Sequence, residues 1–205
     1  MDDRLDRIID FCKLIDKEKT IFRKAYLSDG KTFEDDAGHS WHLAVMALLL
    51  ADYANEKVDV LKVVSILLVH DLVEIYAGDT YAYDTEGQRT RREREKSAAD
   101  RLYSVLPDDL ALRFRGLWDE FEASETPEAL FAHTLDNIQP LLLHAATDGK
   151  AWKERGHRLS EILKRNTRTG EGSEALWAYA RKNFIRPQLE NGHLKEDCPL
   201  DQDKK

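Results

Sequence analysis

The helical spacing of apolar residues in two segments is the feature that most constrains the fold. Residues 38–54 read GHSWHLAVMALLLADYA, and residues 58–76 carry a second apolar run, LKVVSILLV. Apolar positions in both segments recur three and four residues apart, as on one face of a helix, and the alternating runs typical of strands are scarce. The chain is therefore predicted to be an all-α helical bundle.

The remaining helices are predicted from weaker periodicity and from start signals such as Thr126-Pro127. Pro140 is expected to kink or interrupt the helix that contains it. Besides the two apolar segments, the predicted helices cover residues 3–17, 19–27, 88–105, 107–122, 126–147, 157–166 and 173–190.

The length and the linker pattern predict one domain. The chain has 205 residues, enough to bury a substantial core, and no Pro/Gly/Ser-rich stretch divides it. Residues 1–194 are assigned to this domain, with its last helix ending near residue 191. The polar residues 195–205 are predicted to form a disordered tail.

Charge and cysteine content restrict the partners and the compartment. The net charge of −8 disfavours binding to a nucleic acid polymer, although a few local Arg or Lys side chains could hold a small phosphorylated ligand. Cys12 and Cys198 are far apart and indicate a reducing compartment. The acidic N-terminus does not resemble a signal peptide, and no apolar run approaches the length of a bilayer span. These observations predict a cytoplasmic protein without a membrane partner.

The second apolar segment ends in a cluster of groups that could bind a metal ion. His70 and Asp71 adjoin its apolar run, and Glu74 and Asp79 follow within two turns. Neighbouring helical positions diverge by about 100°, so His70 and Asp71 could reach one ion only near a helix end. An isolated His-Asp pair is more often a hydrogen-bonded helix end.

Two other segments strengthen the metal interpretation. His39 opens the first apolar segment, and Asp136 lies among apolar residues in FAHTLDNIQPLLL. Buried carboxylates are rare unless they are paired or bound to a cation. Two imidazoles and two carboxylates would suit Mn²⁺, Co²⁺, Zn²⁺ or Fe²⁺. His42 is a rival ligand one turn after His39, and His133 is an ambiguous neighbour of Asp136.

The order of these residues resembles that of a known enzyme family. EDDAGHSWHLAVMA, LLVHDLVEIYAGDT and FAHTLDNIQPLL are similar to segments of the HD-domain metal-dependent phosphohydrolase superfamily. The similarity is strongest to the branch that includes the bacterial 5′-deoxynucleotidases and HD-domain-containing protein 2. It covers residues 19–150, the expected core, and implies an HD-domain-like helical bundle with a metal site between buried helices.

The resemblance also implies roles for individual residues. The implied ligands of one divalent transition metal ion are His39, His70, Asp71 and Asp136. Glu74 and Asp79 are the implied catalytic acid/base residues, and Glu34 is grouped with the substrate site, where it would orient a neighbour. Two departures concern the substrate pocket: Gly38 replaces the usual acid before the first histidine, and an upstream Arg-Trp pair is replaced by Arg23-Lys24.

The resulting functional prediction is a metal-dependent phosphomonoesterase acting on nucleoside 5′-monophosphates through a metal-activated water. Arg23 and Lys24 would hold the phosphate, with Arg23 ranked first because guanidinium binds phosphate in a bidentate manner. One alternative is hydrolysis of another small phosphoester: a diphosphate, a cyclic nucleotide or a non-nucleotide phosphate. Another is a non-catalytic module whose metal only ties helices together. The apolar faces of residues 117–123 and 175–184 could be ordinary core or cover a homodimer interface, which is common in this branch.

Overall fold

The computed structural model describes residues 3–200 as a helical protein with one short hairpin. Its longer helices are α1 (Asp3–Ile15), α2 (Asp36–Leu50), α3 (Val60–Val69), α5 (Thr85–Tyr103), α6 (Asp108–Ala123) and α7 (Pro127–Ala146). The shorter ones are α4 (Glu74–Ala77), α8 (Lys150–Arg155), α9 (Leu159–Arg165), α10 (Thr169–Gly172), α11 (Glu174–Ala180) and α12 (Arg186–Glu190). Single helical turns η1 (Asp16–Thr20), η2 (Ala51–Tyr53) and η3 (Arg181–Ile185) complete them. The all-α prediction is confirmed.

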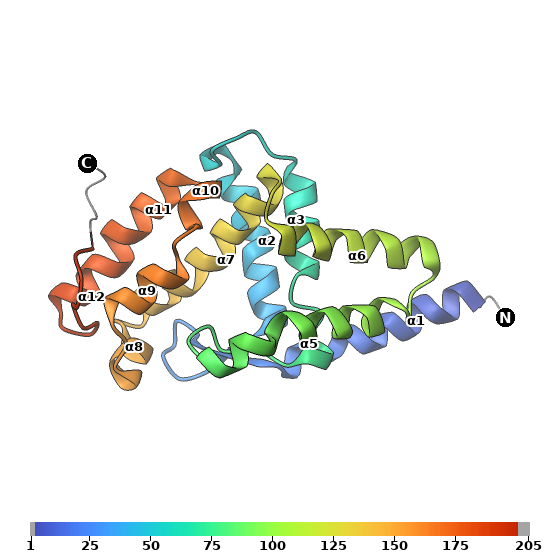
Figure 1. The fold of residues 1–205 in the computed structure, drawn as a ribbon, viewed down its shortest axis with the longest axis horizontal. Coiled ribbons are helices and arrows are strands. Elements are labelled where there is room, and N and C mark those ends of the chain that lie inside the picture. Colours follow the sequence, from blue (N-terminus) through green and yellow to red (C-terminus); the bar gives the residue numbers. More distant parts are fainter. Residues whose placement is uncertain (1–2, 201–205) are drawn as a thin grey trace.

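Helix α7 lies at the centre of the fold and packs against α2, α3 and α6 (Figure 1). The C-terminal helices α8–α12 lie toward one end of the molecule, and α1, α5 and α6 extend toward the other (Figure 1). One apolar cluster joins α2, α3 and α7 to the C-terminal helices, and a second joins α1, α5, α6 and the end of α3. The segment that ends α3 therefore lies where the two clusters meet.

The helix predicted at residues 19–27 is wrong. Residues Phe22–Tyr26 form strand β1, which pairs antiparallel with β2 (Phe33–Asp35) through an irregular register. The Asp29 side chain accepts hydrogen bonds from the Lys31 and Thr32 amides, and Gly30 has a φ of +64°. An Asp-Gly pair with this geometry makes a hairpin turn, a signal that outweighs the weak helical period of six flanking residues.

The helix predicted at residues 58–76 is broken in the middle. Asp59 caps its start by accepting hydrogen bonds from the amides of Leu61 and Lys62. After Val69 the chain makes tighter turns, with the Leu72 amide bonded to the Val69 carbonyl and the Glu74 amide to that of Asp71. This break changes the directions of neighbouring side chains, which resolves the difficulty of a His-Asp pair on a regular helix.

The first residues of the predicted C-terminal tail contact the helical domain. The Lys195 amide bonds to the His157 carbonyl, and the Asp197 carboxylate accepts two hydrogen bonds from Ser160. Leu200 is buried in the larger apolar cluster. These contacts order residues 195–200 despite their polar sequence, and residues 201–205 of the predicted tail lie outside the described part. The assignment of residues 1–194 to one domain stays a prediction.

The structure also bears on Pro140, on the turn at residues 148–149, on several aromatic residues and on membrane crossing. Helix α7 continues through Pro140 without interruption, and a short helix, α8, follows residues 148–149. Trp118 and Phe121 are core residues, whereas Tyr179 is exposed. Across residues 3–200, none of the helices combines the length and the apolar character that crossing a bilayer would require.

Candidate metal centre and substrate cavity

Three helices bring His39, His70 and Asp136 to one buried point. Asp35 caps α2 by accepting a hydrogen bond from the Gly38 amide, which fixes His39 in the first turn of this helix. His70 ends α3, and Asp136 lies in the middle of α7. All three side chains are buried. One potential ligand atom from each lies within 4.8 Å of the other two.

The two imidazoles point at the same carboxylate oxygen. His39 Nε2 lies 3.0 Å and His70 Nε2 lies 3.8 Å from Asp136 Oδ1. The Nδ1 atoms are held elsewhere: that of His39 lies 3.0 Å from Gln139 Oε1, and that of His70 lies 2.7 Å from the Leu67 carbonyl. Because each Nδ1 faces an acceptor and donates to it, each Nε2 can present a lone pair, as a metal-bound histidine must.

The donor set fits a divalent cation. His70 Nε2 is buried and makes no well-formed hydrogen bond, although oxygens of Asp71 and Asp136 lie near it. A buried nitrogen in this state is costly unless something else satisfies it. Two nitrogens and one oxygen converging on one point match borderline ions better than Mg²⁺ or Ca²⁺. Burial alone would lower the pKa of His70, but Asp71 and Asp136 raise it well above its usual value. The pocket is therefore built to favour positive charge.

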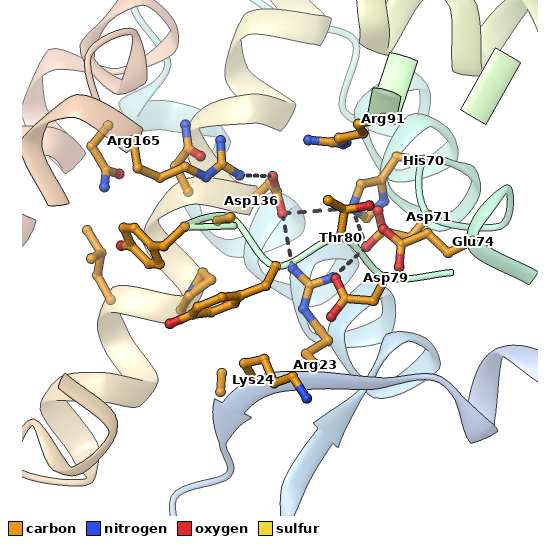
Figure 2. A pocket seen from close by; sticks show the side chains of 18 of the residues that line it. Arg23, Lys24, His70, Asp71, Glu74, Asp79, Thr80, Arg91, Asp136 and Arg165 are labelled. Carbon is orange, nitrogen blue, oxygen red and sulfur yellow. Dashed lines mark hydrogen bonds and ion pairs between the residues drawn. The ribbon is translucent and has the colours of Figure 1, made fainter. Parts of the chain in front are cut away.

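Asp71 lies beside this cluster and pairs with the guanidinium of Arg23. Its Oδ2 atom is 3.1 Å from His70 Nε2 and 2.7 Å from Arg23 Nη1. Arg23 rises from β1 between Asp71 and Asp136, and its Nη1 also lies 3.4 Å from Asp36 Oδ1 (Figure 2). Of the four predicted ligands, three have potential ligand atoms within 4.8 Å of one another, and Asp71 adjoins them through its direct contact with His70 while it pairs with Arg23.

Glu74 and Asp79 line the cavity above the cluster. Glu74 opens α4 and is buried. Burial and the nearby charges of Asp71 and Asp36 raise the pKa of Glu74 well above its usual value. Gly78, with a φ of +74°, ends α4 and turns the chain so that Asp79 also reaches the cavity. Burial likewise raises the pKa of Asp79.

Glu34, His42 and His133 do not reach the cavity lining. Glu34 accepts a hydrogen bond of 2.5 Å from Gln139 Nε2, and the same amide lies 3.1 Å from His42 Nδ1. The contact of Glu34 with Gln139 orients His39 from behind, in keeping with the orienting role expected of it, and its place in the substrate site stays a prediction. His133 stacks on Phe121 and bonds to the Phe121 carbonyl.

Several cavity residues were missed by the sequence analysis. Arg165 Nη2, from α9, lies 3.4 Å from Asp136 Oδ2, so Arg23 and Arg165 approach the same carboxylate (Figure 2). Arg91, from the charged helix α5, is held by Glu95 at 2.6 Å and also faces the cavity. Nothing in their sequence surroundings distinguishes these arginines from solvated surface charges. Tyr81, Tyr83, His144 and Arg155 also line the cavity and were not predicted.

Comparison with known proteins agrees with this geometry. A sequence model of the HD domain matches residues 15–177. The chain belongs to the HD-domain family. It is 44% identical to a crystal structure described as a predicted metal-dependent phosphohydrolase from Magnetospirillum magnetotacticum MS-1, with a TM-score of 0.88, covering 94% of this chain and 96% of that one.

Named relatives place the HD-domain chain in a particular branch. It is 30% identical over 139 residues to 5′-deoxynucleotidase HDDC2 of Danio rerio, which covers 67% of this chain and 68% of the relative. The Xenopus laevis protein of the same name is 30% identical over 136 residues, 66% of each chain. This HD-domain protein is thus a metal-dependent phosphohydrolase of the branch that contains these 5′-deoxynucleotidases.

Proposed function

We propose that the protein is a phosphomonoesterase that hydrolyses nucleoside 5′-monophosphates to nucleosides and phosphate. The observation that carries this proposal is the buried His39–His70–Asp136 cluster, whose His70 and Asp136 line a cavity together with Glu74 and a guanidinium group. The names of the relatives support the nucleotide substrate.

His39, His70 and Asp136 would hold one divalent ion, with Asp71 as the fourth ligand. Mn²⁺, Co²⁺, Zn²⁺ and Fe²⁺ all suit this donor set. When bound, such an ion supplies Lewis-acid activation of water and offsets charge on the phosphoryl group. The contacts of Gln139 and the Leu67 carbonyl to the two imidazoles keep their Nε2 atoms aimed at the ion.

Arg23 would bind the phosphate oxygens. Its guanidinium already lies among four carboxylates, and its side chain is largely buried, so it is fixed before substrate arrives. A fixed guanidinium binds a phosphate with little loss of side-chain entropy. Lys24, the next residue on β1, lies farther out along the cavity (Figure 2) and would interact with the substrate more weakly.

Glu74 would transfer the proton. Burial and the neighbouring carboxylates raise its pKa well above the usual value, so Glu74 holds a proton more readily than an ordinary glutamate and suits a group that accepts a proton from water and returns one to the leaving oxygen. Asp79 lies on the loop after α4 and would contact the sugar side of the substrate or share the proton transfer.

A substrate panel tests this proposal. Purified protein loaded separately with Mn²⁺, Co²⁺, Zn²⁺ or Fe²⁺ is assayed for phosphate release from ribo- and deoxyribonucleoside 5′-monophosphates, nucleoside diphosphates, cyclic nucleotides and sugar phosphates. Release from the 5′-monophosphates at the highest kcat/KM supports the proposal. Preference for another class establishes the alternative phosphoester reaction, and no hydrolysis with any ion or substrate favours the non-catalytic module.

We also propose a cytoplasmic homodimer. Two distant free cysteines and an acidic sequence support the compartment. Large apolar side chains stand exposed on the packed helices α2 and α3, among them Trp41, Leu49 and Leu61. Light scattering after gel filtration should give twice the mass of 23.6 kDa. Leu49→Lys with Leu61→Lys should yield the monomer mass, and a monomeric wild type would contradict the proposal.

A further inference from the structure

The loop after Asp79 carries aromatic side chains into the same cavity. Tyr81 and Tyr83 lie within residues 78–84 and line the cavity together with Asp79. Their rings meet edge to face, with centroids 5.3 Å apart. The cavity therefore combines a polar floor at His70, Asp71 and Asp136 with an aromatic wall.

The Tyr81 hydroxyl is fully engaged by the C-terminal helices. It lies 2.7 Å from His157 Nε2, and His157 Nδ1 lies 3.0 Å from Glu161 Oε2. A carboxylate can only accept, so Nδ1 carries the proton and Nε2 is the acceptor for the Tyr81 O–H. His157 is buried, and this chain of hydrogen bonds fixes the ring orientation of Tyr81.

Two further contacts hold the Tyr81 ring. The Arg155 guanidinium lies 5.3 Å from its ring centroid and donates a hydrogen bond to the Lys24 carbonyl on β1. The Tyr83 ring packs on His157 with centroids 4.4 Å apart. Because its hydroxyl is bonded to His157, Tyr81 offers the cavity an apolar ring held in one position.

A phosphate group gains little from contact with an apolar ring, whereas a planar base can stack on it. We propose that Tyr81 determines specificity for the nucleoside part of the substrate by stacking against its base, and that His157 and Glu161 are positioning residues for Tyr81. This inference rests on the proposed nucleotidase function and assigns the base-binding side of the same cavity. Stacking of a base on an aromatic side chain typically changes affinity about 5- to 150-fold.

Separate inhibition constants for the two halves of the substrate test the inference. The holoenzyme hydrolyses a nucleoside 5′-monophosphate in the presence of either the free nucleoside or inorganic phosphate as competitive inhibitor. For Tyr81→Ala, the substrate KM and the nucleoside Ki should each rise at least about fivefold, with kcat and the phosphate Ki unchanged. Tyr179→Ala, an exposed tyrosine on α11, is the matched control and should change none of the four constants.

The hydrogen-bonded chain is tested with variants that keep aromatic rings. Tyr81→Phe and His157→Phe should each raise the nucleoside Ki by less than Tyr81→Ala does, and the double variant should be no worse than either single one, because both remove the same bond. Circular dichroism and melting temperature verify folding of each variant.

The outcomes separate this inference from the function on which it rests. If the wild type hydrolyses nucleotides but Tyr81→Ala leaves the nucleoside Ki unchanged, or raises the phosphate Ki equally, base stacking on Tyr81 is wrong and the nucleotidase proposal survives. If the wild type hydrolyses no nucleotide, both proposals are overturned.

Discussion

The inner and outer halves of the cavity are built in different ways. The inner half, with His70 and Asp136 and with His39 behind them, is carried by helices α2, α3 and α7, which also form the larger apolar core. The outer half, with Tyr81 and Arg155, depends on a loop and on short C-terminal helices joined by side-chain hydrogen bonds. The helical core therefore positions the candidate metal ligands, whereas the loop and the short helices around it carry the residues proposed to determine the substrate.

The largest effect that separates the halves is expected at Glu74. Glu74→Gln should lower kcat by about 10²- to 10⁴-fold because it removes the proton-transfer group. Its metal content should stay unchanged, and its melting temperature should not fall, because the raised pKa means that burying this charge is unfavourable in the wild type. The exposed Glu56→Gln serves as control, and full turnover by Glu74→Gln would exclude a role in proton transfer.

The second-largest effect is expected at Arg23, whose positive charge lies between the two halves of the cavity. Arg23→Lys keeps a cation but loses the paired contacts to Asp71 and Asp136. A hydrogen bond to a charged group contributes about 1.5–3 kcal/mol, so kcat/KM should fall by about 10- to 100-fold. Steady-state kinetics should show a smaller loss for Lys24→Met. Equal losses for both would mean that Arg23 does not hold the phosphate.

A third prediction uses pH to probe the outer half. Burial, with the charge of Arg155, lowers the pKa of His144 from 6.5 to about 3. Below pH 6.5 the unfolded chain therefore takes up a proton at this residue, whereas the folded protein does not. The stability that His144 contributes is complete above pH 6.5 and is lost as the pH falls toward 3. Between pH 8 and pH 5, urea unfolding should show about 2 kcal/mol more loss in the wild type than in His144→Gln. Parallel curves would show that His144 titrates normally.

The smallest effect is expected at the C-terminal segment that supports the outer half. Asp197→Ala removes the acceptor for the Ser160 amide and hydroxyl at the start of α9. Loss of such a cap costs about 1 kcal/mol in the free energy of unfolding. The exposed Asp52→Ala is the control in the same urea titration. No difference between the two variants would mean that residues 195–200 do not stabilise α9.

The same contrast explains what the sequence could predict. His39, His70 and Asp136 stand out because a charged or polar group that is buried in an apolar helical run requires a partner. A polar residue in such a run can be recognised from the sequence alone. Tyr81 and Arg165 carry no such anomaly: an aromatic residue in a loop and an arginine on a short helix have many ordinary explanations. Their positions follow from contacts between segments about 75 and 30 residues apart, which local periodicity does not encode.

Strand β1 and the break after Val69 were not predicted because neither has a distinctive local sequence pattern. Strand β1 is too short for its period to separate it from a helix, and only the Asp29-Gly30 turn signals the hairpin. The break after Val69 arises because the His70 side chain bonds to the Leu67 carbonyl and the backbone tightens, a local competition that an apolar pattern conceals.

The metal content of the purified protein tests the central claim most directly. After equilibration with a trace divalent metal mixture and desalting, elemental analysis should find about one ion per chain in the wild type and in Glu74→Gln. It should find almost none in His39→Ala, His70→Ala or Asp136→Ala that remain folded by circular dichroism. Equal metal content in wild type and these three variants, or full phosphatase activity of the wild type in excess chelator, would contradict the account.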